Sequence, residues 1–362
     1  MPLILENVSK TVGAVAHLSD ISLELADGSL NVLLGATLSG KTSLMRIMAG
    51  LDPPSRGRVR TGGRDVTGLP VQRRDVAMVY QQFINYPSLS VRENIASPLR
   101  VARLPAATIR TRVDEAASLL RLEPYLDRLP HELSGGQQQR TAIARALVKR
   151  AELVLLDEPL ANLDYKLREE LREELPRIFA ASGAIFVYAT TEPAEALLLG
   201  GRTATLDEGR VAQFGPTAEV YRRPGDLATA RAFSDPPLNT LAGTKRDGAI
   251  ELAGGVRVPV AGALRAVSDG PCVVGFRAHH LAFERAGADE VEIAATVSVS
   301  EITGSESFVH LDAGAERLVA LVPGICRLEP GSPVTASLRP RDLLVFGPSG
   351  RLATAPAAGR SG

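Results

Sequence analysis

The sequence contains few of the features that mark disulfide-rich, metal-binding or nucleic-acid-binding proteins. It has two cysteines, Cys272 and Cys326, and neither lies in a CxxC pair or a metal-ligand spacing, so two reduced, buried thiols are expected. Basic and acidic residues each number 41, which gives a formal net charge of zero. Binding to a phosphate backbone requires a basic surface, so nucleic acid is not expected as the main partner.

Long apolar runs are also missing. No stretch approaches the length of a membrane-spanning helix. The N-terminal segment MPLILENVSK reaches Glu6 before an apolar region of signal-peptide length can form. We therefore expect a cytosolic chain. Its hydrophobic content of 45% is ordinary for a globular protein. Because 362 residues exceed the usual size of a single core, one larger and one smaller domain are expected.

The first part of the chain alternates strand and helix patterns. Apolar residues recur at intervals of three and four over 105–122, and a second helix is predicted over 136–149, just before the apolar strand LVLLD. This alternation is typical of a parallel, helix-covered sheet. Beyond residue 235 short valine-rich strands alternate with Gly, Pro and Asp turns, which predicts a small β-barrel or sandwich. The predicted divisions are an α/β domain over 1–235, an all-β domain over 236–350 and a disordered tail over 351–362.

A glycine-bearing loop follows the apolar strand LNVLLG. The segment GATLSGKTS at 35–43 has the spacing G-x-x-x-x-G-K-[ST] between a strand and a predicted helix. The N–H groups of such a loop surround phosphates, while Lys41 supplies a cation and the hydroxyl of Thr42 a ligand for Mg²⁺. A glycine turn with a surface lysine is the alternative. The nucleotide-binding residues predicted here are Gly35, Ala36, Thr37, Leu38, Ser39, Gly40, Lys41, Thr42 and Ser43.

Two further segments complement this loop. The strand LVLLDE at 153–158 ends in Asp157, which can hold Mg²⁺, and in Glu158, which can deprotonate an attacking water. The segment LSGGQQQR at 133–140 places a serine and two glycines before a helix, which predicts a second helix N-terminus that accepts anions. An ordinary serine cap fits the local chemistry but does not account for the whole string LSGGQQQR. A single nucleotide does not need two phosphate cradles, so the second one calls for an explanation.

With these motifs in this order, the chain resembles the ATP-binding subunits of ATP-binding cassette (ABC) transporters over nearly its whole length. The resemblance rests on the phosphate loop, Gln81 in MVYQQF, LSGGQ at 133–137, LLDEP at 155–159 and ANLD at 161–164. The β-rich part resembles the accessory oligonucleotide/oligosaccharide-type (TOBE-like) barrel of sugar and polyol importers. The combined pattern is similar to the ATPase subunits of bacterial glycerol importers.

The resemblance implies a P-loop ATPase fold and a head-to-tail pair of cassettes. Ser134, Gly135, Gly136 and Gln137 of one cassette would contact ATP held on the phosphate loop of the other. Gln81 would join Asp157 and Thr42 at Mg²⁺, take part in catalysis, and link the site to a helical subdomain over 83–130 that touches the membrane partner. Asp164 would lie in the loop that crosses between the two sites.

Three positions depart from the family pattern. The strand AIFVYA is followed by Thr190, Thr191 and Glu192, so Thr191 stands where the family has a catalytic histidine. A hydroxyl donates a hydrogen bond but neither carries charge nor shuttles a proton near neutral pH, so slower hydrolysis is expected. Val12 replaces an aromatic ring that would stack on adenine, and Leu38 replaces a glycine.

These departures affect the chain's own site and leave LSGGQ intact. We therefore expect a pair with a second, non-identical ATPase subunit that supplies a complete site. The alternative is a lineage variation in which Thr191 serves adequately. The resemblance further implies ATP and Mg²⁺ as cofactors, transmembrane permease subunits and a periplasmic or lipid-anchored solute-binding protein as partners, and a peripheral position on the cytoplasmic side of the bacterial inner membrane. The function implied is ATP-driven import of glycerol or a related polyol or sugar. Two alternatives are a soluble non-transport ABC ATPase and a catalytically weak scaffold subunit.

Overall fold

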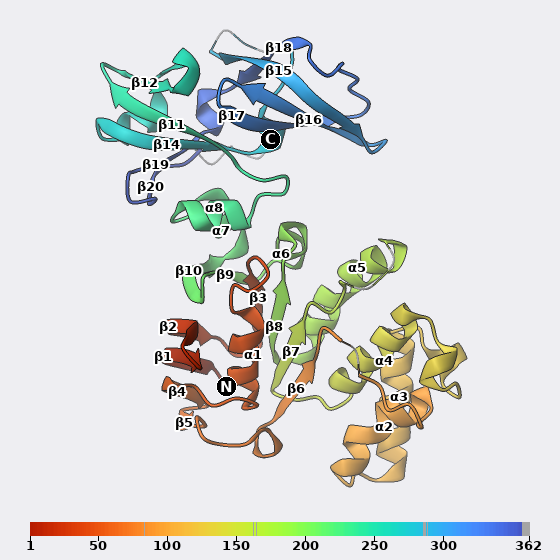
Figure 1. Ribbon diagram of the computed structural model, residues 1–362. Coiled ribbons are helices and arrows are strands. Elements are labelled where there is room, and N and C mark those ends of the chain that lie inside the picture. The colour runs from red at the N-terminus through yellow and green to blue at the C-terminus, as the bar shows by residue number, and fades with distance from the viewer. Residues whose placement is uncertain (83, 162, 164, 285–286, 288, 357–362) are drawn as a thin grey trace. The chain divides into compact units, whose positions relative to one another are not determined.

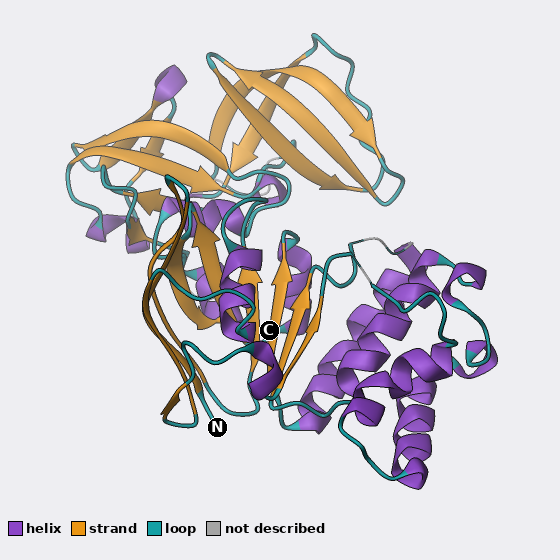
Figure 2. Cartoon of the chain, turned by 60° about the horizontal axis from the view of Figure 1, so that its bottom comes forward, coloured by secondary structure: helices purple, strands orange, loops and turns teal. Residues whose placement is uncertain are grey.

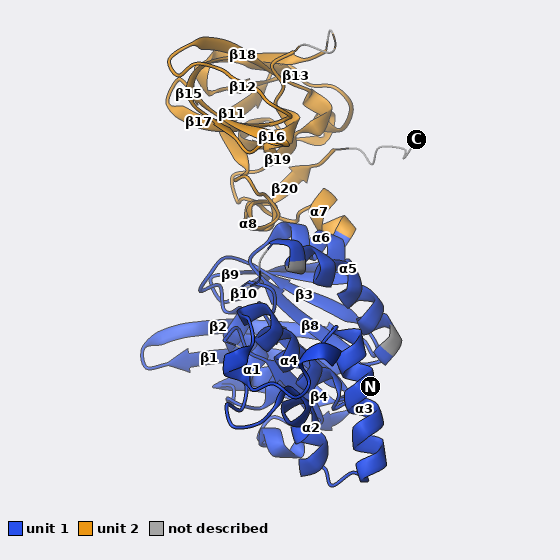
Figure 3. Cartoon of the chain, turned by 90° about the vertical axis from the view of Figure 1, so that its right-hand side faces the viewer, with its two compact units in different colours: residues 1–217 blue, residues 218–362 orange. Residues whose placement is uncertain are grey.

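A computed structural model describes residues 1–82, 84–161, 163, 165–284, 287 and 289–356. The chain divides into two compact units, Met1–Thr217 and Ala218–Gly362 (Figure 3). The sequence places this division later, after residue 235. Among the described residues, no helix is long and apolar enough to cross a membrane.

The first unit is built on a six-stranded sheet of order β10-β9-β3-β8-β7-β6, in which only β10 and β9 pair antiparallel. Its central strands are continuous apolar runs, as expected where a parallel sheet is covered on both faces. The strands are β3 (Leu30–Leu34), β6 (Val76–Val79), β7 (Leu153–Asp157), β8 (Ile185–Thr190), β9 (Arg202–Asp207) and β10 (Arg210–Pro216).

A second, antiparallel sheet packs against the first through a helix. Its order is β2-β1-β4-β5, with β1 (Leu3–Val12), β2 (Val15–Leu25), β4 (Arg56–Thr61) and β5 (Arg64–Asp65). Apolar residues of β1, of helix α1 (Lys41–Ala49) and of β7 and β8 share one buried cluster. Helix α1 is therefore fixed between the two sheets, which holds its N-terminus at the edge of the parallel sheet.

The remaining helices of this unit fall into two groups (Figures 1 and 2). Helices α5 (Tyr165–Ser182) and α6 (Pro193–Leu199) flank β8, whereas α2 (Val91–Val101), α3 (Ala106–Leu119) and α4 (Gly135–Leu147) form a helical lobe beside the β6 edge. The helices predicted over 105–122 and 136–149 correspond to α3 and α4. Short 3-10 turns cover Val71–Arg73, Glu123–Tyr125 and Pro130–Glu132.

The second unit is a β-structure formed by two antiparallel sheets, of order β13-β12-β11-β14-β19-β20 and β17-β16-β15-β18. Both sheets contribute to one apolar core, with Val274 and Phe276 from one sheet and Val309 and Leu311 from the other. The strands are β11 (Asn239–Arg246), β12 (Ala249–Leu252), β13 (Arg257–Pro259), β14 (Gly270–Phe276), β15 (Val291–Ile302), β16 (Glu306–Ala313), β17 (Glu316–Pro323), β18 (Pro333–Leu338), β19 (Leu344–Phe346) and β20 (Leu352–Thr354). The accompanying helices are α7 (Thr217–Arg222) and α8 (Leu227–Ala232), with 3-10 turns at Ala253–Gly255, Gly262–Ala266, Ala278–His280 and Pro340–Asp342.

The C-terminal segment differs in part from the expectation of a disordered tail over 351–362. Residues 352–354 form β20 because their backbone pairs with β19, and the N–H of Leu352 also donates to the carbonyl of Gly225 at 2.9 Å. Residues 357–362 lie outside the described residues.

Candidate nucleotide-binding site

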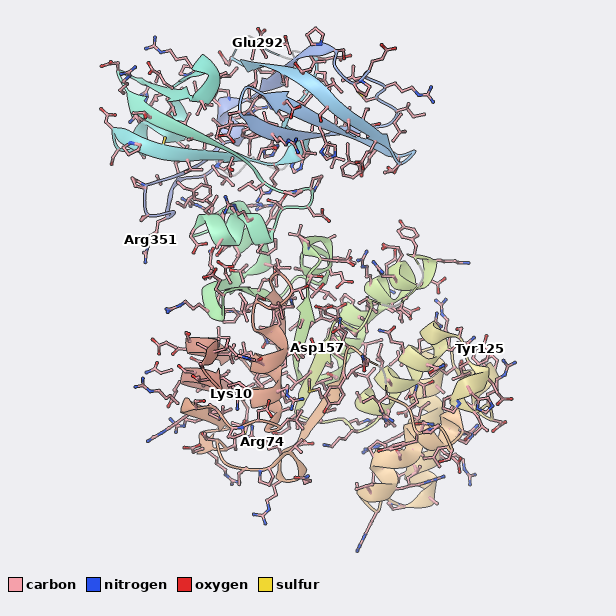
Figure 4. All side chains as sticks on the ribbon, in the orientation of Figure 1. Lys10, Arg74, Tyr125, Asp157, Glu292 and Arg351 are labelled. Atoms are coloured by element: carbon pink, nitrogen blue, oxygen red, sulfur yellow. The ribbon has the colours of Figure 1, made fainter. Side chains whose placement is uncertain are left out.

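The predicted site residues of the first unit follow four neighbouring parallel strands. The loop from Gly35 follows β3, Gln81 follows β6, Asp157 ends β7 and Thr191 follows β8. Because the carboxyl ends of parallel strands share one edge of a sheet, these segments are brought together there, where open α/β sheets bind ligands. Asp157 lies inside this unit in Figure 4.

Packing explains both glycines of the phosphate loop. A Cβ atom on Gly35 would lie 2.4 Å from the carbonyl oxygen of Leu206. Gly40 has φ 104° and precedes the first residue of α1, and a Cβ there would lie 2.8 Å from the side chain of Leu18. Glycine is therefore required at both positions, and the loop delivers the free N–H groups of α1 to its open side.

Leu38 carries a large side chain although its backbone, like that of Gly40, has a positive φ. Its φ is 69° and its side chain is 97% exposed. A left-handed conformation costs an L-residue roughly 1–2 kcal/mol. The replacement of a glycine by Leu38 is thus present as backbone strain in the loop.

Lys41 is buried and folds back over its own loop. Its Nζ donates to the carbonyl oxygens of Gly35 at 2.8 Å and Ala36 at 3.0 Å, and it lies 3.7 Å from Oε1 of Glu158. Burial lowers the pKa of Lys41, while Glu158 and Asp157 act in the opposite direction. A buried ammonium whose nearest acceptors are loop carbonyls is suited to exchange them for phosphate oxygens.

Two carboxylates face this lysine. Asp157 is 3% exposed and accepts a hydrogen bond from the hydroxyl of Thr42, and burial raises the pKa of its carboxyl group. Glu158 accepts from Nε2 of Gln81 at 3.1 Å. The φ of Glu158 is 46°, and its N–H donates to the carbonyl of Ala189 at 3.0 Å. Strained backbone of this kind is frequent at functional sites, and here it turns the Glu158 side chain toward Lys41 and Gln81.

The oxygen ligands of this cluster suit Mg²⁺. The described residues contain no group of three or more His, Cys, Asp or Glu side chains placed to hold a metal. Mg²⁺ is usually held by one or two carboxylates together with substrate phosphates and waters. The hydroxyl of Thr42 and the buried carboxylate of Asp157 fit that pattern. Gln81 lies close to them, since it donates a hydrogen bond to Glu158, the residue after Asp157.

The serine–glycine segment caps a helix in the helical lobe. The hydroxyl of Ser134 accepts from the N–H of Gln137 at 3.4 Å, and the side chain of Gln137 accepts from the N–H of Ser134 at 3.0 Å. Ser134 and Gly135 are exposed. This capping box leaves the hydroxyl and the first N–H groups of α4 at the surface, where an external anion can reach them.

The hairpin between β1 and β2 lies next to the start of α1. Val12, at its tip, is 51% exposed. His17 is exposed, and it is the residue left unpaired by a register shift between Leu18 and Ala16. Its Nδ1 lies 3.5 Å from the hydroxyl of Ser43. Bulges commonly redirect a side chain beside a functional site, so the hairpin supplies both an apolar and an imidazole surface here.

Thr191 is exposed beyond the end of β8, and the structure reveals what holds the segment that carries it. The N–H of Glu192 donates to Oγ1 of Thr190 at 3.0 Å, and the carboxylate of Glu192 pairs with Arg168 at 3.0 Å and also with Arg172. The sequence-based prediction did not include Glu192 and these arginines among the site residues. The acidic residue after Thr191 was the available signal. Asp164, assigned to the crossing loop, lies outside the described residues.

Comparison with protein families identifies two segments. Residues 18–161 match the family model "ABC transporter" and residues 291–345 match the model "TOBE domain". The first match spans the phosphate loop, Gln81, the α4 cap and both acidic residues, and the second lies within the β-structure of the second unit.

Curated relatives are similar over almost the entire chain. An sn-glycerol-3-phosphate import ATP-binding protein UgpC of Paracoccus denitrificans is 37% identical over 352 residues, covering 96% of this chain and 98% of the relative. A sulfoquinovosyl glycerol transport ATP-binding protein of Agrobacterium fabrum is 34% identical over 94% of this chain and 96% of its own length. A solved dimeric ATP-binding cassette, MJ0796 in a post-hydrolysis state with ADP and Pi, is 29% identical with a TM-score of 0.54, and covers 59% of this chain and 98% of that one.

Proposed function

The chain belongs to the family of ABC-transporter ATP-binding proteins of the import type, and from this premise we propose that it drives uptake of a glycerol-containing solute such as glycerol 3-phosphate. It is an ATPase coupled to transport. The sequence predicts glycerol or a related polyol or sugar. The names of two relatives, one for glycerol 3-phosphate and one for sulfoquinovosyl glycerol, support an anionic glycerol derivative within that class.

The observation that carries the ATP-hydrolysing part of the proposal is the contact cluster of Lys41, Glu158 and Gln81 at the carboxyl edge of the parallel sheet. The loop N–H groups and Lys41 would bind the phosphates of ATP, with Nζ leaving the carbonyls of Gly35 and Ala36 to do so. Thr42, Asp157 and Gln81 would hold Mg²⁺, which when bound neutralises charge on the phosphate oxygens.

Glu158 would orient and deprotonate the attacking water. Its carboxylate is held by Gln81 on one oxygen and faces Lys41 with the other, which orients the group before substrate arrives. Thr191 would donate a hydrogen bond to the γ-phosphate without supplying charge. Val12, together with His17 beside Ser43, would border the nucleoside.

Two cassettes would complete each site. The exposed cap formed by Ser134, Gly135, Gly136 and Gln137 would reach the nucleotide of the facing cassette, which explains two phosphate cradles in one chain. The dimeric cassette among the solved relatives supports pairing of two copies of this chain. A second, non-identical ATPase has no support from the comparisons, and it stays a prediction from Thr191 and Val12.

Membrane permease subunits and a solute-binding protein are the remaining partners of an import ATPase of this kind. A peripheral position on the inner face of the membrane follows from the proposed role. ATP-driven closure and opening after hydrolysis would act by binding one conformation of the permease better than another.

Glu158→Gln tests the proposed chemistry. The amide keeps the size and the contact with Gln81 but cannot accept a proton, so kcat for ATP hydrolysis by the assembled transporter should fall at least about 100-fold. The affinity for Mg·ATP should stay within a factor of about two, because the loop is intact. Lys41→Ala should instead abolish nucleotide binding. A Glu158→Gln variant that hydrolyses ATP at the wild-type rate contradicts the assignment.

A further inference from the structure

Two loops that flank the candidate site are connected by one side chain of α5. The first loop follows Glu158 and contains Ala161 and Leu163, and the second contains Thr191 and Glu192. Helix α5 lies beside β8 and α6 (Figure 1). Arg168, in the first turn of this helix, contacts both loops and is partly buried, with 24% of its side chain exposed.

The two ends of the Arg168 guanidinium have different partners. Its Nη1 donates to Oε1 of Glu192 at 3.0 Å. Its Nη2 donates to the carbonyl oxygens of Ala161 at 3.4 Å and Leu163 at 3.5 Å. A planar fork of fixed donors can hold two such groups at a constant separation, whereas an ammonium acts as a single point charge.

The side chain of Glu192 is held in place by other groups besides Arg168. Arg172, on the same face of α5, pairs with Glu192 and lies 3.2 Å from Glu195. Glu195 is buried and accepts from the hydroxyls of Thr190 at 2.6 Å and Tyr188 at 3.0 Å. The segment after β8 is therefore tied to the buried end of the strand as well as to α5.

Two described residues of the loop after β7, Ala161 and Leu163, are held by backbone hydrogen bonds. The N–H of Ala161 donates to the carbonyl of Glu158 at 3.2 Å, and that of Leu163 donates to the carbonyl of Leu160 at 3.3 Å. The first turn connects Ala161 to the backbone of Glu158, and the second closes on Leu160. The side chain of Arg168 and these two turns therefore form a continuous set of contacts between the two loops.

We propose that Arg168 is a positioning residue that locks the loop after Glu158 to the loop bearing Thr191, so that the catalytic carboxylate and Thr191 are oriented as one unit. The catalytic consequence rests on the proposed function, whereas the coupling of the loops does not. Such coupling matters here because a threonine side chain is short, so its reach toward a phosphate depends on where its backbone is held.

Hydrogen exchange of the nucleotide-free chain tests the coupling without any activity. Arg168→Ala should accelerate exchange at the amides of Ala161, Leu163 and Glu192 by about 10-fold or more, since each is a hydrogen-bonded N–H of a connected loop. Glu192→Gln removes the charged partner in one loop only, yet it should also accelerate exchange at Ala161 and Leu163. Acceleration confined to residues 191–192 would overturn the proposal.

Arg168→Lys separates the fork from the charge. A lysine keeps a positive charge near Glu192 but lacks the second donor arm, so exchange at Ala161 and Leu163 should rise as it does in Arg168→Ala. Full protection in the lysine variant would assign Arg168 to a simple ion pair and overturn the bridge. Arg121→Ala is the matched control, because Arg121 also binds two carboxylates of α5, Glu170 and Glu174, away from both loops. It should leave exchange in both loops unchanged.

The assembled transporter then tests the catalytic consequence. Arg168→Ala should lower kcat for ATP hydrolysis by about 10-fold or more, while KM and the affinity for Mg·ATP change by less than about two-fold. Arg121→Ala should keep the wild-type kcat, and melting temperatures of both variants verify that they are folded. Coupled loops with an unchanged kcat would overturn the catalytic part alone. Loss of hydrolysis in Glu158→Gln tests the proposed function separately.

Discussion

Thr191 stands at the end of β8, where its hydroxyl can donate one hydrogen bond but cannot hold a charge near neutral pH. Thr191→His should therefore raise kcat for ATP hydrolysis, by about 10-fold or more, since charge-positioning and acid–base groups typically contribute factors of about 10²–10⁴. The backbone there is already held by Glu192 and Arg168, so the imidazole enters a fixed loop. The measurement is steady-state ATPase of the assembled transporter. Thr191→Ser, which keeps a hydroxyl, is the control and should match the wild type. An unchanged rate in the histidine variant would mean that the hydroxyl is sufficient.

Asn94 fixes the backbone of residues 86–90, the turn that leads into α2. It is fully buried in α2, its Oδ1 accepts from the N–H of Tyr86 at 2.8 Å, and its Nδ2 donates to the carbonyls of Tyr86, Leu89 and Ser90. Asn94→Ala leaves these groups without a partner and should lower the free energy of unfolding by about 2–4 kcal/mol. Denaturant unfolding measures this loss. Asn94→Asp keeps the acceptor but loses the donors, and it should also destabilise the chain. A neutral alanine variant would show that water replaces the amide.

The elements differ in how far their own sequence determines them. Helix α1 and strand β7 were predictable residue by residue, because glycine loops, periodicity and apolar runs are local signals. Helix α2 lies within the helical subdomain over 83–130 that the resemblance implies, but its own bounds were not predicted. Ser90 and Glu93 form a capping box at its start, whereas Pro98 interrupts its pattern. The ties of Arg168 and Arg172 to the segment after β8 could not be predicted, because they depend on which charged residues of α5 face that strand. Local motifs thus identified the phosphate loop and its carboxylates, and tertiary packing decided what orients them.

The second unit contains a buried histidine, and the shift of its pKa on folding makes the stability of the unit sensitive to acid. Burial, together with His279, Arg277 and Arg339, lowers the pKa of His280 to about 4, and Asp342 only partly opposes this. An unfolded chain has a histidine pKa of about 6.5. Between about pH 4 and pH 6.5, His280 therefore binds a proton in the unfolded chain but not in the folded chain. Stability therefore falls as pH drops from 6.5 toward 4.

The loss between pH 7 and pH 5 should be roughly 1–2 kcal/mol. Hydrogen exchange of the core strands β14 and β16 at the two pH values, in urea, measures it. His280→Leu should remove most of the difference. His310→Gln, an exposed histidine of the same unit that faces Glu301 at 3.5 Å, should leave it in place. An equal pH dependence in wild type and His280→Leu would assign the acid sensitivity to other groups.

At the scale of the assembly, pairing of two copies of this chain predicts that two inactive variants recover ATP hydrolysis when they are mixed. Lys41→Ala disables the phosphate loop, and Ser134→Arg places bulk and charge at the exposed cap of α4, so each variant alone should have no complete site. A mixed dimer unites the intact loop of one chain with the intact cap of the other. Because random pairing makes half of the dimers mixed and each holds one complete site of two, a 1:1 mixture should regain roughly a quarter of the wild-type hydrolysis.

The readout is ATPase activity after the two purified variants are mixed, exchanged and reassembled with the permease. Each variant mixed with itself is the control. Recovery near a quarter establishes composite sites shared between two copies of this chain and argues against an obligatory second ATPase, because only this polypeptide is present. If the mixture recovers no activity, although wild-type chains assembled in the same way hydrolyse ATP, the proposal of a composite site between two copies is contradicted. The departures from the family pattern at Thr191 and Val12 would then favour pairing with a non-identical ATPase subunit that supplies the complete site.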